Sequence, residues 1–275
     1  FQEVCQYLEF LYQVFRFLRH SLAPEYHRSF LEELRAKIPH GFICPNANPD
    51  GTYRGGNHTV NGATRANAYG VDMNRNYPDP VDGAHPDGEA YAMETEWFMD
   101  FAEEYQFTMA AHYHGGAELM NYPWDNNYER HADDAWWQMV SREYADLCQD
   151  AAQSSDPYYM TDEENGITNG ADWYTIGGGR QDFMNYYHQC REVTIECSSV
   201  KCPAPSNLPT FWDYNYNSIF AYMNQALYGI HGTVIDAETK EPLQATIEIL
   251  NHDQEYSMVE SQLPMGDFHR PIKSG

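Results

Sequence analysis

One stretch of the chain, residues 110–125, constrains the fold more than any other. It reads Ala-Ala-His-Tyr-His-Gly-Gly-Ala-Glu-Leu-Met-Asn-Tyr-Pro-Trp-Asp, and its apolar start ends at His114, directly before two glycines. This pattern predicts a buried strand that delivers an imidazole to the edge of a sheet. Open α/β sheets bind their ligands at such strand ends. We therefore expect a functional site around His114.

Length and composition narrow the class of protein. At 275 residues the chain is long enough for one sizeable core with a small appendage. The aromatic content of 15% indicates a packed globular protein. The formal net charge of −25 disfavours nucleic acid and anionic membranes as partners and favours cationic ligands. No stretch of about 18 uninterrupted apolar residues occurs, so we expect no membrane insertion. No signal peptide is visible either.

Helical and strand patterns alternate along the first four fifths of the chain. This alternation predicts an α/β fold, with a mixed central sheet flanked by helices, in one domain over residues 1–228. Helices are expected over residues 1–20, 29–37, 89–105, 132–152 and 210–228, and strands over 41–44, 107–114 and 192–197.

The pattern changes after Gly229. Residues 230–236 and 244–250 alternate between apolar and polar, with a turn at 238–242 between them, which predicts a β-hairpin. We expect residues 229–275 to form a second, all-β unit. It is too short for a complete β-sandwich, which needs several more strands to bury a core.

A basic pair lies in the long irregular stretch between the first expected strand and the helix that follows. Asn74 and Arg75 are adjacent, and Arg65 lies upstream. Such a group can hold a carboxylate, because a guanidinium offers a planar fork and Asn adds a neutral donor. A surface salt bridge beside a turn is the competing interpretation. The scarcity of other basic residues nearby favours the carboxylate site.

Two strands present ionisable side chains on one face. In the strand expected at 192–197, Glu192 and Glu196 share a face because side chains alternate. A carboxylate at the end of a buried strand can act as a general base, although many strand-end residues are merely solvated. His112 and His114 also share a face, and such a pair can bind a metal.

Several short motifs, taken in order, resemble one known family. They are Asn-Pro-Asp-Gly at 48–51, Arg65, Asn-Arg-Asn-Tyr-Pro at 74–78, His-Gly-Gly at 114–116, Asn-Tyr-Pro-Trp-Asp at 121–125, Gly-Ile-Thr-Asn-Gly at 166–170, Asp-Trp-Tyr at 172–174, Gln-Asp-Phe at 181–183 and Thr-Ile-Glu at 194–196. The chain resembles the zinc metallocarboxypeptidases, and within them the regulatory subgroup typified by carboxypeptidases D, E and N. The resemblance implies the same mixed α/β fold, followed by a partial transthyretin-like β-domain.

The resemblance also implies roles for residues around a zinc ion. His114 would be a ligand of the zinc, and Glu196 would be the general base that activates the water bound to it. Arg65 would polarise the scissile carbonyl and stabilise the oxyanion. A zinc ion lowers the pKa of its bound water to about 7 and acts as a Lewis acid.

A second group of residues is implied in substrate binding. Asn74 and Arg75 would hold the C-terminal carboxylate of a peptide or protein, with Tyr174 closing over it. Asp125 and Gln181 match positions in the pocket for the last side chain. Because a buried Asp pairs well with Lys or Arg, the implied activity is a secreted or periplasmic exopeptidase that prefers C-terminal basic residues.

One motif of the family is absent from its usual place. The family holds zinc with His-x-x-Glu ahead of the Asn-Pro-Asp-Gly region, but none of the three histidines upstream of Asn48 has a Glu at that spacing. The only such pair is His252 with Glu255, in the appendage, and we interpret it as chance. His112 is a poor substitute because a third ligand would still be lacking.

Three interpretations follow. In the first, the chain is truncated at both ends and belongs to an active enzyme. In the second, it is a non-catalytic peptide-binding homologue that has lost its metal ligands. The third is a zinc deacylase of small amides, which the pocket motif at 121–125 and the β-appendage disfavour.

Overall fold

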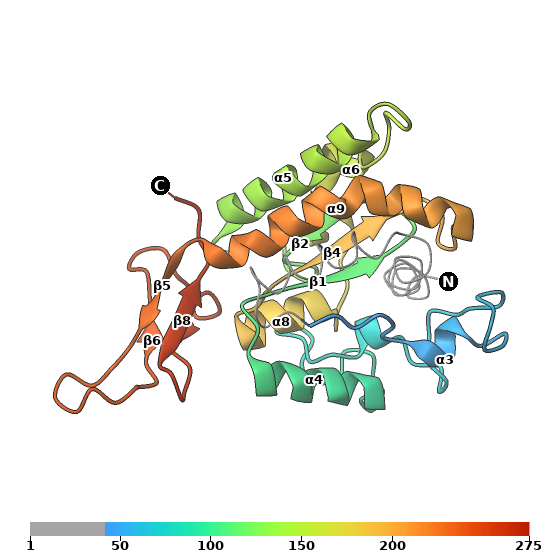
Figure 1. The fold of residues 1–275 in the computed structure, drawn as a ribbon. Coiled ribbons are helices and arrows are strands. Elements are labelled where there is room, and N and C mark those ends of the chain that lie inside the picture. Colours follow the sequence, from blue (N-terminus) through green and yellow to red (C-terminus); the bar gives the residue numbers. More distant parts are fainter. Residues whose placement is uncertain (1–41, 275) are drawn as a thin grey trace, which may run out of the picture.

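The computed structural model describes residues 42–274, which form a mixed sheet with helices on both faces and a small β unit at the C-terminal end (Figure 1). The helices expected over 1–20 and 29–37 lie outside the described residues. The strand expected at 41–44 is wrong for residues 42–44, which are irregular. There Phe42 packs on the rings of Phe101 and Tyr105, with ring centroids 5.2 and 4.6 Å away, and joins no sheet.

Four strands make the central sheet, in the order β1-β4-β2-β3. They are β1 (Met109–His114), β2 (Glu118–Tyr122), β3 (Ile167–Asn169) and β4 (Arg191–Cys197). β1 runs parallel to β4, β2 runs antiparallel to β4, and β3 is parallel to β2. The predicted strands at 107–114 and 192–197 are thus confirmed as β1 and β4. β4 lies between β1 and β2 in the sheet, and β1 pairs with β4.

Helices cover each face of the sheet. On one face lie α5 (Asp134–Ala152) and α9 (Leu208–Asn224), and on the other lie α4 (Met93–Tyr105) and α8 (Arg180–His188) (Figure 1). In α5 the buried residues recur at helical spacing and include Trp137, Val140 and Tyr144, so one stripe of the helix faces the sheet. The helix expected at 89–105 begins only at Met93, because Asn76 Oδ1 accepts the N–H of Ala92 and fixes the entry to the helix.

Strand pleating separates the core from the polar residues. Val193, Ile195 and Cys197 of β4 point into the large hydrophobic cluster formed with α5 and α9. By alternation, Glu192, Thr194 and Glu196 of β4, with His112 and His114 of β1, face the side of α8. All seven residues of β4 are buried, the carboxylates included. The sheet therefore gathers ionisable side chains in a place where water is scarce.

The segment between residues 49 and 92 contains only α3 (Pro49–Thr52) and the short 3-10 helix η1 (Met73–Arg75). Buried polar side chains hold its turns together. Asn76, which has no exposed surface, accepts from Ala92 N and Thr95 Oγ1 and donates to Asp87. Asp79 accepts from the backbone N–H groups of Val81 and Gly178 and from the side chain of Asn126.

The C-terminal unit, residues 229–274, contains β5 (Ile230–Thr233), β6 (Thr246–Ile247), β7 (Val259–Glu260) and β8 (Asp267–Arg270). β5 pairs with β8 and β6 pairs with β7, both antiparallel. The predicted turn forms, with Asp236 accepting from the N–H groups of Glu238 and Thr239. The predicted pairing of the two flanking segments is wrong beyond one bridge, because the main partners of both strands come from later in the chain.

A buried ionic cluster ties this unit to the rest of the protein. Asp133, just before α5, lies 2.7 Å from Arg191 and 2.8 Å from Arg270, and these three side chains have no exposed surface. Arg270 also binds Asp253 of the C-terminal unit, and His252 Nε2 lies 2.8 Å from Asp133 Oδ1. Burial would raise the pKa of Asp133, but the two guanidinium groups hold it at about 2. We call these five residues the Asp133 cluster.

Removing one cation from the Asp133 cluster is expected to destabilise the protein strongly. Arg270→Met leaves the Asp133 and Asp253 carboxylates buried beside fewer positive charges, so the free energy of unfolding falls by about 3–5 kcal/mol. Urea unfolding measures the change. The control is Asp146→Asn, which breaks an exposed pair with Arg142 on α5 and shifts the free energy by less than about 1 kcal/mol. A small loss for Arg270→Met, similar to the control, contradicts this account.

Candidate functional site

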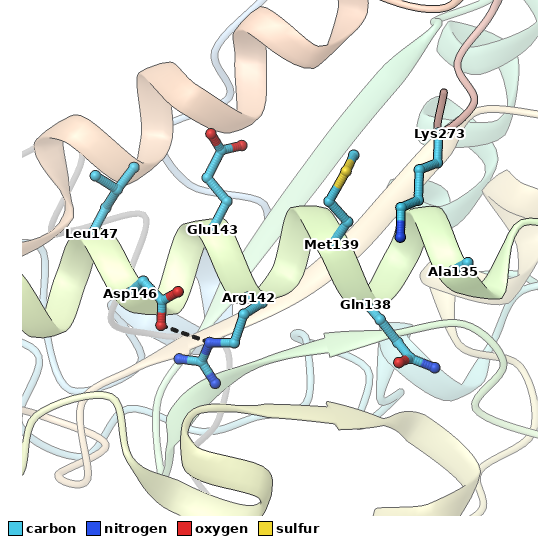
Figure 2. A pocket seen from close by; sticks show the side chains of 8 residues that line it. All are labelled: Ala135, Gln138, Met139, Arg142, Glu143, Asp146, Leu147 and Lys273. Atoms are coloured by element: carbon cyan, nitrogen blue, oxygen red, sulfur yellow. Dashed lines mark hydrogen bonds and ion pairs between the residues drawn. The ribbon is translucent and has the colours of Figure 1, made fainter. Parts of the chain in front are cut away.

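A small polar pocket opens where β1 and β4 end, and it collects residues from six separate segments. Its lining residues are Arg65, Asn74, Arg75, His114, Asn121, Asp125, Trp173, Tyr174, Ile176, Thr194 and Glu196. Every residue predicted for the site lines it except Gln181. The larger hollow of the described residues lies elsewhere, along α5 towards Lys273, and contains none of them (Figure 2).

His114 and Glu196 meet because of strand register. They are paired residues of the parallel strands β1 and β4, and the distance between His114 Nδ1 and Glu196 Oε1 is 3.7 Å. Both side chains are more than nine-tenths buried. Burial, with the nearby charge of Arg65 among others, lowers the pKa of His114 well below its usual value. The imidazole is therefore neutral at pH 7, the form that binds metals.

His112 shares the face of His114 but serves a different purpose. Its Nδ1 lies 2.7 Å from Glu192 Oε1, and its Nε2 lies 2.9 Å from Thr194 Oγ1. Glu192 also accepts from the guanidinium of Arg180 at 2.7 Å. Both ring nitrogens of His112 are thus engaged beneath the pocket, and the ring offers no lone pair to a metal beside His114.

The cationic side of the pocket is built on Asp72. This residue caps η1, with Oδ1 accepting from Asn74 N at 3.1 Å, while Oδ2 lies 2.5 Å from Arg65 Nε. Asn48 donates to the carbonyl of Arg65 and fixes the backbone there. Asp72 therefore sets the spacing between Arg65 and the residues of η1, a role that the sequence interpretation did not assign.

Asn74 and Arg75 point to the pocket from this 3-10 helix. Asn74 Oδ1 accepts from the backbone N–H of Arg180 at 2.9 Å, so the amide nitrogen of Asn74 is the group left to face a ligand. Arg75 donates to the carbonyl of Asn74 and is partly exposed. Tyr174, 47% exposed, lies at the mouth. Donors therefore converge from one side, as an anionic ligand group requires.

Asp125 forms the opposite wall. Its side chain is buried, and Oδ1 accepts from Asn121 Nδ2 at 2.8 Å and from Gln181 Nε2 at 3.0 Å. Burial raises the pKa of Asp125 to about 6, although the bond from Asn121 and the charge of Arg75 oppose that rise.

Gln181 lies behind this wall and not on it. It is fully buried, donates to Asp125, and accepts from the N–H and hydroxyl of Thr194. It therefore connects Asp125 to β4.

Asp182, next along α8, accepts from the backbone N–H groups of Asp125 and Asn126, and burial raises its pKa well above the usual value. Sequence alone did not identify Asp182, since its partners lie more than fifty positions away.

The donors around His114 make only part of a zinc site. A catalytic zinc takes three protein ligands. Among residues 42–274, the pocket offers His114 and the carboxylate of Glu196 and no other imidazole, so His114 fits as one ligand and the set is incomplete. In the part of the chain that the structure describes, one group of three donors is close enough to hold a metal, Asp133, His252 and Asp253, and there the Arg270 guanidinium already binds both carboxylates.

Comparison with known sequences identifies the family of the chain. Residues 27–218 match the zinc carboxypeptidase family. Carboxypeptidase D of Mus musculus is 35% identical over 225 residues, which cover 76% of this chain and 16% of that protein. Carboxypeptidase SOL1 of Arabidopsis thaliana is 30% identical over 267 residues, or 94% of this chain and 50% of that protein. The chain thus spans half or less of the length of these curated relatives.

Solved structures show the same fold. Carboxypeptidase A from Helicoverpa armigera superposes with a TM-score of 0.52 at 18% identity, covering 66% of this chain and 50% of that one. Bovine thrombin-activatable fibrinolysis inhibitor, in a complex with tick carboxypeptidase inhibitor, gives a TM-score of 0.51 at 15% identity and covers 71% of this chain and 73% of that one. These likenesses show the fold, and the family match over residues 27–218 places the chain in the zinc carboxypeptidase family.

Proposed function

We propose that this protein is a zinc-dependent exopeptidase that releases the C-terminal residue of peptides and proteins, with a preference for Lys and Arg. The observation that carries the proposal is one pocket with two unlike walls. Asn74 and Arg75 line it with donors, and Asp125 lines it with a buried carboxylate. A C-terminal Lys or Arg residue has the matching pair of charges.

The cationic wall accounts for exopeptidase action. A free C-terminal carboxylate can take the planar fork of Arg75 and the amide of Asn74 together. A chain that continues past this point has no carboxylate to offer these donors. Tyr174 lies at the mouth, where a closing movement of its ring would exclude water from the bound residue.

The acidic wall accounts for the choice of last residue. Burial, together with the charge of Asp125, raises the pKa of Asp182, so Asp125 is the carboxylate of the pair that carries charge at neutral pH. A buried charge without a cation is costly, and a Lys or Arg side chain supplies one. Asn121 and Gln181 hold Oδ1 in place and leave Oδ2 for that partner.

The chemistry assigned to the remaining residues follows from their position. Glu196 is the proposed general base, because it is a buried carboxylate beside His114 at the end of β4. Arg65 is the proposed donor to the oxyanion, from the cationic side of the same pocket. Zinc is the proposed cofactor, with His114 as one of its ligands, although the described pocket does not supply a complete set of three.

The proposal extends to organisation and location. We take residues 1–228 as the peptidase domain and 229–275 as a partial transthyretin-like domain. We propose a secreted or periplasmic location on the strength of the family resemblance. Within residues 42–274, no helix combines the length and the apolar character that crossing a membrane requires.

A second function is supported by one observation. Because the described pocket holds a single imidazole, the carboxylate-binding wall could serve a non-catalytic protein that only binds peptide C-termini. A deacylase of small amides is less well supported, since it has no need for the Asp125 wall.

Zinc content separates the two functions. We expect purified chain 1–275 to hold much less than one zinc per molecule, because His114 and Glu196 alone bind zinc weakly. Elemental analysis after dialysis measures it, with His114→Ala as the control. Stoichiometric zinc that disappears in His114→Ala contradicts the expectation and shows that residues outside 42–274 complete the site.

The preference for basic residues is tested by release of the last residue from peptides that end in Arg, Lys or Phe. We expect faster release of Arg and Lys in the zinc-loaded enzyme. Asp125→Asn removes a charge-assisted bond worth about 2 kcal/mol, so the Arg-to-Phe ratio of kcat/KM falls by roughly 30-fold. Asp146→Asn on α5 is the control and leaves the ratio unchanged. Faster release of Phe by the unaltered enzyme would refute the preference.

The same ratio is expected to depend on pH. Asp125 is ionised above its pKa of about 6 and neutral below it. The preference for Arg is therefore full at neutral pH and lost as the pH falls through about 6. Taking the ratio of kcat/KM for Arg and Phe peptides cancels the groups that both reactions share, and kcat/KM reports the free enzyme. A ratio that stays constant across this range argues against Asp125.

A further inference from the structure

We propose that Tyr256, in the C-terminal unit, is a positioning residue for the specificity pocket: it packs on Trp124 and so fixes the place of Asp125. The inference rests on the proposed function, in which Asp125 selects the last residue of the substrate. It gives the C-terminal unit a part in peptide selection.

Tyr256 meets Trp124 directly. The ring centroids are 4.9 Å apart with the planes at 89°, an edge-to-face contact. His131 and Tyr186 complete an aromatic cluster around Tyr256, with centroids 5.1 and 6.0 Å away. Burial raises the pKa of Tyr256, while hydrogen bonds from the side chain of Trp124 and the backbone of Ala132 act against that rise. The phenol is thus held by both packing and polar contacts.

Trp124 is the residue before Asp125, and the turn they share is fixed on its inner side by the peptidase domain. Trp124 O accepts from Ala171 N at 2.8 Å, and Asp125 O accepts from Ile176 N at 3.1 Å. Asp125 N donates to Asp182 at 2.9 Å. The Trp124 indole is 3% exposed, and Tyr256 covers it on the side of the C-terminal unit. Without that ring the turn would be held from one side only.

The loop that presents Tyr256 is itself tied down. Asp253 accepts from Ile249 N at 2.8 Å and from Ser257 Oγ at 3.1 Å. Ser257 Oγ in turn accepts from Gln254 N. Because Asp253 is bound by Arg270 of the Asp133 cluster, the loop is anchored next to the peptidase domain through Asp253, and Ser257 is bonded back to that same residue. This arrangement sets the ring against Trp124 rather than leaving it on a free loop.

A geometric role predicts a selective effect. Small displacements of a binding group weaken a directional ion pair much more than they weaken apolar contacts. Loss of the Tyr256 ring is therefore expected to reduce affinity for a basic last residue and to spare affinity for an apolar one. A purely structural contact would lower both together.

The experiment compares Tyr256→Ala, Tyr256→Phe and the control Leu250→Ala, a residue of the same unit that is 75% exposed. Calorimetry measures the affinity of each for two tripeptides, Ala-Ala-Arg and Ala-Ala-Leu. We expect Tyr256→Ala to bind the Arg peptide about tenfold more weakly and the Leu peptide less than about twofold more weakly. Tyr256→Phe retains the ring and most of the selectivity, and Leu250→Ala changes neither affinity.

Equal losses for the two peptides, or no loss in Tyr256→Ala, overturn the proposal. Hydrogen exchange of the segment 121–126 supplies a readout that needs no substrate. We expect faster exchange at the amides of Asp125 and Asn126 in Tyr256→Ala, with exchange in α9 unchanged. Unchanged exchange in 121–126 would show that Tyr256 does not position the turn. If the unaltered protein binds both peptides equally, the proposed function fails, and the exchange data still decide whether Tyr256 positions the turn.

Discussion

The parallel pairing of β1 with β4 is the constraint on which the site depends. It places His114 opposite Glu196, and strand alternation then puts His112, Glu192 and Thr194 on the same face. A slip of one residue would send all of these into the hydrophobic cluster under α5 and α9. Burial of Val193 and Ile195 fixes the register of β4. The apolar residues of this strand therefore determine where its polar residues lie.

The net charge of the protein and the local charge at the pocket have opposite signs. The protein as a whole is strongly acidic, with a formal net charge of −25, and so attracts basic peptides over long distances. At the pocket the local charge is positive instead: burial is the main cause of the lowered pKa of His114, and the charges of Arg65, Arg75 and Arg180 add to it. In the proposed function, a peptide with a basic side chain and a free carboxylate would be attracted by the net charge and oriented by the arginines of the pocket.

Much of the peptidase domain could be predicted from the sequence, because its signals are local. The alternation of apolar and polar residues predicted β1 and β4, and helical spacing predicted α5 and α9. The ordered motifs predicted the pocket, and all but Gln181 of the assigned residues line it. The Asp133 cluster and the contact of Tyr256 with Trp124 were beyond prediction, because they depend on residues far apart in the chain, such as Asp133 and Arg270, which are 137 positions apart. The pairing of β5 with β8 was not predicted either, because the nearer turn at 238–242 gave a stronger local signal.

The irregular segment that carries Arg65, Asn74 and Arg75 has almost no ladder hydrogen bonds, yet its turns close on Asn76 and Asp79, which are buried and fully used. Loops usually tolerate insertions because nothing inside them depends on their length. Here an added residue would pull a buried amide or carboxylate away from donors on distant turns. Although this segment is the least regular part of the fold, insertions and deletions in it are expected to be poorly tolerated.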